Sequence, residues 1–186
     1  MQIIKRIILI SLSLIGVGFA FYLYRGQNRS TLKIENFVFD KDALAVDQLF
    51  HQGDNWYWMI YNGGQDTYSL DFALRNATSS QYEKRHDMIF KVGKINGKIV
   101  GFLAYYPESK HVWGLRFLIV DQEIRRQGLA KKLLKYAVDD MVSRGAIRID
   151  LSTRNNNFKA QGLYKGFGFT IVRSDYEFVH LSWCKK

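Results

Sequence analysis

One glycine and three basic side chains lie close together in the loop formed by residues 120–131. The glycine is Gly128, and the basic residues are Arg125, Arg126 and Lys131. A helix is expected to begin directly after this loop, and the first N–H groups of a helix have no intrahelical partner and carry positive partial charge. Because glycine has no side chain, the backbone can approach an anion closely here. The residues therefore predict a phosphate-binding loop, with an ordinary turn as the alternative.

The loop is expected to join a strand to a helix. Residues 112–120 are rich in β-branched and aromatic side chains, which favours a strand. The helix is expected to run to Arg144 and to end at Gly145, and residues 146–151 alternate as a further strand. The apolar positions of the helix recur every four residues at Leu129, Leu133, Ala137 and Met141, with Leu134 and Val138 beside them. The unit is therefore a strand, a glycine-containing loop, a helix and a strand.

The residues before this unit predict three strands and a short helix, in addition to a helix over residues 69–76. Residues 33–40 alternate as a first strand, and residues 42–51 carry apolar side chains that favour a short helix. Residues 88–94 and 98–106 are expected to form the two arms of a hairpin. The dipeptide Asn96-Gly97 between them favours a two-residue turn in which both residues have positive φ.

Two blocks of the sequence resemble motifs of the GNAT superfamily of N-acetyltransferases. Residues 125–130 resemble the pyrophosphate-binding loop of that family, in the form Arg125-x-x-Gly128-x-Ala130. Residues 157–169 resemble a later motif of the family. That second block reads Asn157-x-x-Ala160-x-x-Leu163-Tyr164-x-x-x-Gly168-Phe169. The distance between the two blocks accommodates one helix and one strand, so the motifs occur in order and on the expected elements.

The resemblance implies an α/β (α+β) fold with a GNAT-like mixed central sheet flanked by helices. It is close over residues 88–185 and looser over residues 33–87. We therefore expect residues 31–186 to form one GNAT-like N-acetyltransferase domain. Residues 1–30 are expected to form a separate membrane anchor and linker.

The resemblance also implies acetyl-CoA as the co-substrate and direct transfer of its acetyl group to an amine in a ternary complex. Main-chain N–H groups of residues 127–131 would hold the pyrophosphate. The edge of the strand that ends at Val120 would pair with the pantetheine amides, and a main-chain N–H there would polarise the thioester. The cofactor contacts implied in this way are Leu118, Val120, Arg125, Arg126, Gln127, Gly128, Leu129, Ala130, Lys131 and Asn157.

The roles of two residues in the second motif have competing interpretations. By the resemblance, Tyr164 would protonate the departing thiolate; the alternative is a packed aromatic side chain at a helix end. Asn157 would contact the arm of the cofactor, or it would cap a helix. No motif identifies a general base, although an alkyl ammonium group must lose a proton before it can react. His111, Glu108 and a water relay are the candidates.

The acceptor amine is expected to be recognised by residues 41–87, where the family resemblance is weakest. The aromatic run Trp56-Tyr57-Trp58 could wall a pocket, and Asp47 or Asp54 could attract a cationic amine. Ordinary core aromatics are the alternative for the run. Residues 69–76 are expected to be helical.

Residues 7–24 form an uncharged apolar run with basic residues on both sides. These 18 residues, at about 1.5 Å each in a helix, nearly span a bilayer core of about 30 Å, which predicts a transmembrane helix. A cleaved signal peptide is the alternative, because Gly18-Phe19-Ala20 resembles a cleavage site. Since acetyl-CoA is mainly an intracellular cofactor, we expect a single-pass membrane protein whose catalytic domain is cytoplasmic.

The composition of the 186-residue chain is that of a globular protein with an excess of basic residues. The net charge is +10, and most of the excess lies after residue 125, which favours an anionic partner. The single cysteine, Cys184, excludes an intramolecular disulfide and is expected to be buried as a small apolar residue. The four histidines include no metal-ligand pair at helical spacing, so no metal is expected.

Three functions are compatible with these features. The favoured one is an acetyl-CoA-dependent N-acetyltransferase, tethered to a membrane, that acts on a small-molecule or peptide amine. The second is a GNAT-fold sensor that binds acyl-CoA and catalyses nothing. The third is a basic membrane-proximal module that binds anionic lipid or nucleic acid, although a nucleic-acid partner is disfavoured.

Overall fold

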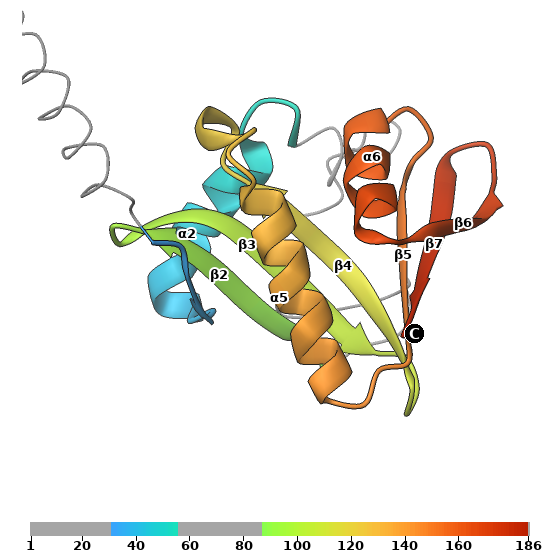
Figure 1. The fold of residues 1–186 in the computed structure, drawn as a ribbon. Coiled ribbons are helices and arrows are strands. Elements are labelled where there is room, and N and C mark those ends of the chain that lie inside the picture. Colours follow the sequence, from blue (N-terminus) through green and yellow to red (C-terminus); the bar gives the residue numbers. More distant parts are fainter. Residues whose placement is uncertain (1–30, 56–86, 186) are drawn as a thin grey trace, which may run out of the picture. The chain divides into compact units, whose positions relative to one another are not determined.

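The structure of the protein is a computed structural model that describes residues 31–55 and 87–185 (Figure 1). The helices and strands, in chain order, are β1 (Lys33–Asn36), α2 (Phe39–His51), β2 (Ile89–Ile95), β3 (Lys98–Pro107), β4 (Val112–Val120), the 3-10 turn η1 (Gln122–Ile124), α5 (Leu129–Ser143), β5 (Arg148–Arg154), α6 (Phe158–Phe167), β6 (Thr170–Ser174) and β7 (Phe178–Cys184).

The strands of the described residues form one mixed sheet. Their order across the sheet is β1-β2-β3-β4-β5-β7-β6. Neighbouring strands are antiparallel except for β4 and β5, which are parallel and are joined through α5. The expected mixed sheet flanked by helices is therefore confirmed (Figure 1).

The hairpin between β2 and β3 forms where the sequence predicts it. Asn96 has a φ of 51° and Gly97 a φ of 80°, so both turn residues have the left-handed conformation that a type I′ turn requires. Ile95 and Lys98 face one another as the first pair of the ladder. The turn is therefore confirmed at the predicted position.

The first strand is shorter than the alternation predicts, because a helix begins within the expected range. β1 ends at Asn36, and α2 starts at Phe39 instead of residue 42. The buried carboxylate of Asp42 accepts a hydrogen bond of 2.9 Å from the backbone N–H of Val38, which stabilises the first turn. Asp40 and Asp42 also interact favourably with the positive end of the helix dipole.

Helices pack on both faces of the sheet. On one face, Leu133 of α5 lies over Gly93 and Gly101, where the missing side chains let the helix approach closely. On the other face, Val46 and Phe50 of α2 pack against aromatic side chains of β3 and β4. Each face of the sheet therefore buries its own apolar cluster. The loop between β4 and α5 begins at the end of a strand that is packed on both faces.

The parallel strands β4 and β5 are paired over a short distance and then separate. The paired residues are Val112 with Arg148, Trp113 with Ile149 and Gly114 with Asp150. Beyond Gly114, β4 pairs with β3 alone, and beyond Asp150, β5 pairs with β7 alone. Among the described strands, none pairs with residues 115–120 on the side that faces β5.

The predicted localisation is corrected. Within residues 31–55 and 87–185, no helix is both long enough and apolar enough to cross a bilayer, which contradicts the expectation of a single-pass membrane protein. Residues 7–24, on which that expectation was based, lie outside the described residues. The same is true of the aromatic run 56–58 and of the helix expected over residues 69–76.

Candidate functional site

A cavity of about 1020 Å³ lies where β4 and β5 separate. Its lining comes from both faces of the sheet, because Leu118 belongs to the apolar cluster under α5 and Phe117 to the cluster under α2. The charged lining residues are the basic Arg116, Arg125, Arg126, Lys131, Arg154 and Lys159 and the acidic Asp54. A cavity of this size with such a lining suits a large anionic ligand.

The amino terminus of α5 opens into this cavity. Gly128, at the N-cap, has a φ of 77°, and no side chain caps the helix there. Leu129, Ala130 and Lys131 form the first turn, line the cavity and include no acidic residue. Their backbone N–H groups have no intrahelical partner and can donate to an anion. The helix terminus that the sequence predicts to bind phosphate thus opens into the cavity, and phosphate binding there stays a prediction.

The loop between β4 and α5 is held by side chains at the end of α2. Arg125 donates from Nη1 to Asp54 at 2.6 Å and from Nη2 to Asn55 at 2.5 Å. Gln52 donates to Asp121 at 2.9 Å and accepts from the N–H of Gln122 at 2.8 Å. Because Arg125 is engaged with Asp54, it positions the loop in addition to lining the cavity.

Asp121 is the buried anchor of this loop. Burial by itself would raise the pKa of its carboxyl group, but hydrogen bonds from Gln52, from the N–H of Glu123 and from Lys98 lower that pKa below its ordinary value. The carboxylate therefore stays ionised and fixes the start of the loop. The sequence offered no signal for Gln52 or Asn55, since neither belongs to a recognised motif.

Tyr164 lies on α6 and lines the cavity from the face of the sheet that α5 also covers. Its ring packs against Phe169 at a centroid distance of 5.8 Å. Burial raises the pKa of Tyr164 to about 12, so its hydroxyl holds its proton at neutral pH. Both sequence interpretations of this residue are compatible with the structure: the ring is packed and the side chain reaches the cavity.

Asn157 is the N-cap of α6. Its Oδ1 accepts a hydrogen bond of 3.2 Å from the N–H of Ala160, as expected for a cap. The residue also lines the cavity, where its amide NH₂ can still donate. Asn157 can therefore cap α6 through Oδ1 and contact a ligand through its NH₂ group at the same time.

The other predicted contact residues gather at the same cavity with one exception. Leu118, Val120, Arg126 and Lys131 line it together with the residues described above, whereas Gln127 is exposed and does not. Arg126 has a φ of 65° and is exposed, so its side chain lies at the solvent side of the loop. The candidate residues thus come from β4, the loop, α5 and α6.

The general-base candidates from the sequence lie elsewhere. His111 is exposed at the start of β4 and contacts the carbonyl of Gly145 at 3.2 Å. Glu108 accepts from the hydroxyl of Tyr106 at 3.2 Å, and neither candidate lines the cavity. Asp54 does line it but is paired with Arg125. Cys184 is exposed, so the expectation that it would be buried was wrong.

A metal site is not formed by the residues that the structure describes. Among them, no group of three or more His, Cys, Asp or Glu side chains is arranged to hold an ion.

Residues 50–169 match the acetyltransferase (GNAT) family, and this range includes both sequence blocks singled out above. A curated relative is the [ribosomal protein bS18]-alanine N-acetyltransferase of Salmonella typhimurium, which is 36% identical over 62 residues. The Escherichia coli K12 protein of the same name is 37% identical over 62 residues. Each alignment covers 32% of this chain and 42% of the relative, so less than half of these relatives is matched.

Solved structures share the fold over a longer stretch. The ribosomal-protein-S18-alanine N-acetyltransferase from Escherichia coli has a TM-score of 0.66 and 19% identity, covering 83% of this chain and 94% of that one. The paiA N-acetyltransferase from Thermoplasma acidophilum, solved in complex with coenzyme A, has a TM-score of 0.69 and 18% identity, covering 83% and 99%.

Proposed function

Since the chain belongs to the acetyltransferase (GNAT) family, we propose that it binds acetyl-CoA and transfers the acetyl group directly to an amine. The uncapped amino terminus of α5, which opens into a basic cavity, is the observation that carries this proposal. We further propose that residues 31–186 form the catalytic domain. The structural relative solved with coenzyme A supports the choice of cofactor.

The residues that would hold the donor fit a pyrophosphate and a pantetheine arm. Backbone N–H groups of Leu129, Ala130 and Lys131 would bind the pyrophosphate, with Arg126 adding charge at the rim. The edge of β4 between residues 115 and 120, where β4 and β5 separate, would bind the pantetheine amides. When bound, the cofactor supplies an activated acetyl thioester.

The chain itself would stabilise charge and supply a proton. A backbone N–H of β4 near Leu118 would donate to the thioester oxygen as negative charge develops on it. Tyr164 would give its hydroxyl proton to the departing thiolate. Leu118 and Tyr164 line the same cavity, so one bound thioester could contact both groups.

An amino group of a protein or peptide is the acceptor that we propose to test first. The curated relatives are named for acetylating an alanine of a ribosomal protein, which favours an acceptor of this class. A small-molecule amine is the alternative substrate. The acceptor would reach the thioester through the part of the cavity lined by β5 and by the end of α2.

The cofactor site can be tested with two variants in which a glycine is replaced by glutamate, one in the proposed phosphate site and one far from it. Gly128→Glu places a carboxylate in the phosphate site, whereas Gly97→Glu places one in the remote hairpin. Both glycines have a positive φ, 77° and 80°, and no atom within 4 Å of an added Cβ, so the local strain is matched. Stability in each variant would be measured as the thermal midpoint of the full chain.

Acetyl-CoA at 100 times its dissociation constant would stabilise the native protein by about 2.7 kcal/mol, a shift of a few degrees. We expect the shift to persist in Gly97→Glu and to disappear in Gly128→Glu. A native protein that shows no shift, or a Gly128→Glu variant that retains the full shift, would contradict the proposed site.

A sensor that binds acyl-CoA without catalysis is the second candidate. It is favoured by one observation: neither His111 nor Glu108 lines the cavity. Thiol release from acetyl-CoA that depends on an added peptide amine distinguishes the two, because a sensor releases none.

A further inference from the structure

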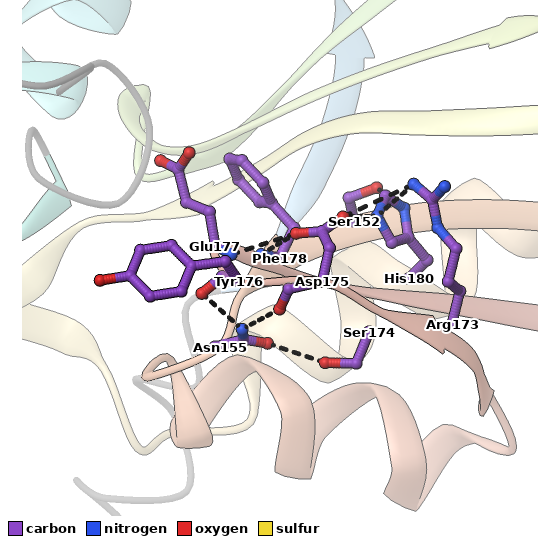
Figure 2. Close-up of polar contacts among 9 residues, drawn as sticks. All are labelled: Ser152, Asn155, Arg173, Ser174, Asp175, Tyr176, Glu177, Phe178 and His180. Carbon is purple, nitrogen blue, oxygen red and sulfur yellow. Dashed lines mark hydrogen bonds and ion pairs between the residues drawn. The ribbon is translucent and has the colours of Figure 1, made fainter.

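A serine, a histidine and an aspartate are joined by hydrogen bonds at the edge of the cavity. Ser152 Oγ lies 2.8 Å from His180 Nδ1, and His180 Nε2 lies 2.9 Å from Asp175 Oδ2 (Figure 2). Ser152 lines the cavity, so one end of this chain of hydrogen bonds opens into the space proposed to bind the substrates. The sequence did not reveal the group, because its members are spread over residues 152–180.

The pairing of β5 with β7 brings the serine and the histidine together. Ser152 and His180 are direct partners in that antiparallel ladder, so their side chains lie on the same face of the sheet. Their neighbours Leu151 and Leu181 point to the other face, into the cluster that contains Tyr164. Ser152 and Tyr164 therefore approach one cavity from opposite faces of the sheet.

Asp175 is held in the turn between β6 and β7. Its Oδ1 accepts from the N–H of Phe178 at 2.8 Å and from the N–H of Glu177 at 3.1 Å, which leaves Oδ2 for His180. The hydrogen bond from His180, followed by that from the N–H of Phe178, lowers the pKa of Asp175 to about 2. The carboxylate is thus ionised and fixed beside the imidazole.

Two neighbours of His180 Nε2 require opposite protonation of that nitrogen. Asp175 Oδ2, at 2.9 Å, can only accept, whereas Arg173 Nη2, at 2.8 Å, can only donate. We assign the hydrogen to Nε2, where it is donated to Asp175, and this tautomer leaves Nδ1 to accept from the hydroxyl of Ser152. Arg173 then pairs with Asp175, at 3.5 Å, instead of with the ring. Arg173 and Asp175 are the charged side chains of the described residues that contact the ring.

The remaining charged groups on this face engage other partners. Asp150 accepts from Ser182 at 2.7 Å, and Arg154 pairs with Glu177. Among the described residues that line the cavity, Asp54 is the one with a carboxylate side chain, and it forms an ion pair with Arg125. The imidazole of His180, reached through Ser152, is therefore the candidate base for the cavity among the residues that the structure describes.

We propose that Ser152 and His180, oriented by Asp175, form the proton relay that serves as the general base; this rests on the proposed acetyl transfer. As the nitrogen of a neutral amine forms its C–N bond, its proton passes to Ser152 Oγ while the Ser152 proton passes to His180 Nδ1. The C–S bond breaks, and Tyr164 protonates the sulfur. His180 then releases its proton to solvent, and Tyr164 regains one from solvent.

The relay can be tested with Ser152→Ala and His180→Gln in the full chain. Ser143→Ala is a matched control, because Ser143 is an exposed serine at the end of α5 that bonds to the carbonyl of Asp140 and does not line the cavity. Ser152→Thr keeps the hydroxyl and should keep most of the activity. The readouts are kcat/KM for amine-dependent thiol release at a series of pH values and the calorimetric Kd of acetyl-CoA.

We expect Ser152→Ala and His180→Gln to lose about 100-fold in kcat/KM near neutral pH, a typical contribution of general-base catalysis, with the Kd of acetyl-CoA unchanged. The loss of kcat/KM relative to the native protein should shrink as the pH rises toward the pKa of the amine. At high pH more of the amine is already neutral, and hydroxide can take up the proton that the relay would have accepted. A defect in packing would not be relieved by alkaline pH.

Three results would overturn the relay. Unchanged kcat/KM in both variants, with an active native protein, rejects the relay and leaves the proposed function standing. An acetyl group found on Ser152 by intact-protein mass measurement would make it a nucleophile instead. No amine-dependent thiol release by the native protein across α-amino and ε-amino peptides would reject the function and the relay together.

Discussion

The guanidinium of Arg125 lies 2.6 Å from the carboxylate of Asp54, although the two residues are 71 positions apart in the chain. This ion pair joins the loop between β4 and α5 to the segment that follows α2. Its side chains are 31% and 41% exposed, so the charges are partly screened by solvent. The pair therefore positions the loop more than it stabilises the fold.

Removal of the guanidinium should affect binding more than stability. We expect Arg125→Ala to lower the free energy of unfolding by about 1 kcal/mol or less, as for a partly exposed pair. The KM for acetyl-CoA should rise about tenfold, because the loop loses its position. Lys135→Ala is the control, since Lys135 pairs with Asp139 on the exposed surface of α5. Fully additive effects of Arg125→Ala and Asp54→Ala on KM would contradict this coupling.

The hydroxyl of Tyr164 should matter for the chemical step alone. We expect Tyr164→Phe to lower kcat about 100-fold while the KM for acetyl-CoA changes little, because the ring still packs against Phe169. Tyr136→Phe on α5 serves as the control, since Tyr136 does not line the cavity. Steady-state thiol release measures both variants. Equal kcat in the two would remove Tyr164 from the mechanism.

The close packing of α5 on the sheet depends on a glycine of β3. A Cβ at Gly101 would lie 2.5 Å from Leu133 Cδ1 and 3.1 Å from the carbonyl oxygen of Ile119. We expect Gly101→Ala to lower the free energy of unfolding by about 1–3 kcal/mol through overpacking. Gly166→Ala, in open space on α6, should raise it by up to about 1 kcal/mol through helix propensity. Denaturant titration gives both values, and the same sign for the two would refute the packing argument.

The carboxylate of Asp175 should make stability depend on acidic pH. Its pKa is about 2 in the folded chain, below the ordinary value of about 3.9 expected when unfolded. A lowered folded pKa contributes stability that is present above the unfolded pKa and is lost as the pH falls through the folded one. The stability advantage of the native protein over Asp175→Asn should therefore hold above about pH 4 and decline toward about pH 2. An advantage that stays constant across this range would show that ionisation is not its source.

Short-range features of the sequence were sufficient for much of the fold. Asn96-Gly97 predicted a hairpin, and the apolar spacing after Gly128 predicted α5 and its uncapped amino terminus. These predictions succeeded because turn conformation and helical periodicity depend on residues a few positions apart. The boundary between β1 and α2 was misplaced, since the hydrogen bond from Val38 to Asp42 overrides the alternation of the preceding residues.

The sequence by itself determined the family resemblance and the position of the loop between β4 and α5, both carried by local motifs. Only the tertiary structure decided that Arg125 meets Asp54, that Glu108 and His111 lie away from the cavity, and that Ser152 faces His180. The physical reason is register: a shift of one residue between β5 and β7 would turn one of the two side chains to the opposite face. Such a pairing depends on the packing of the whole sheet, which no short stretch of residues specifies.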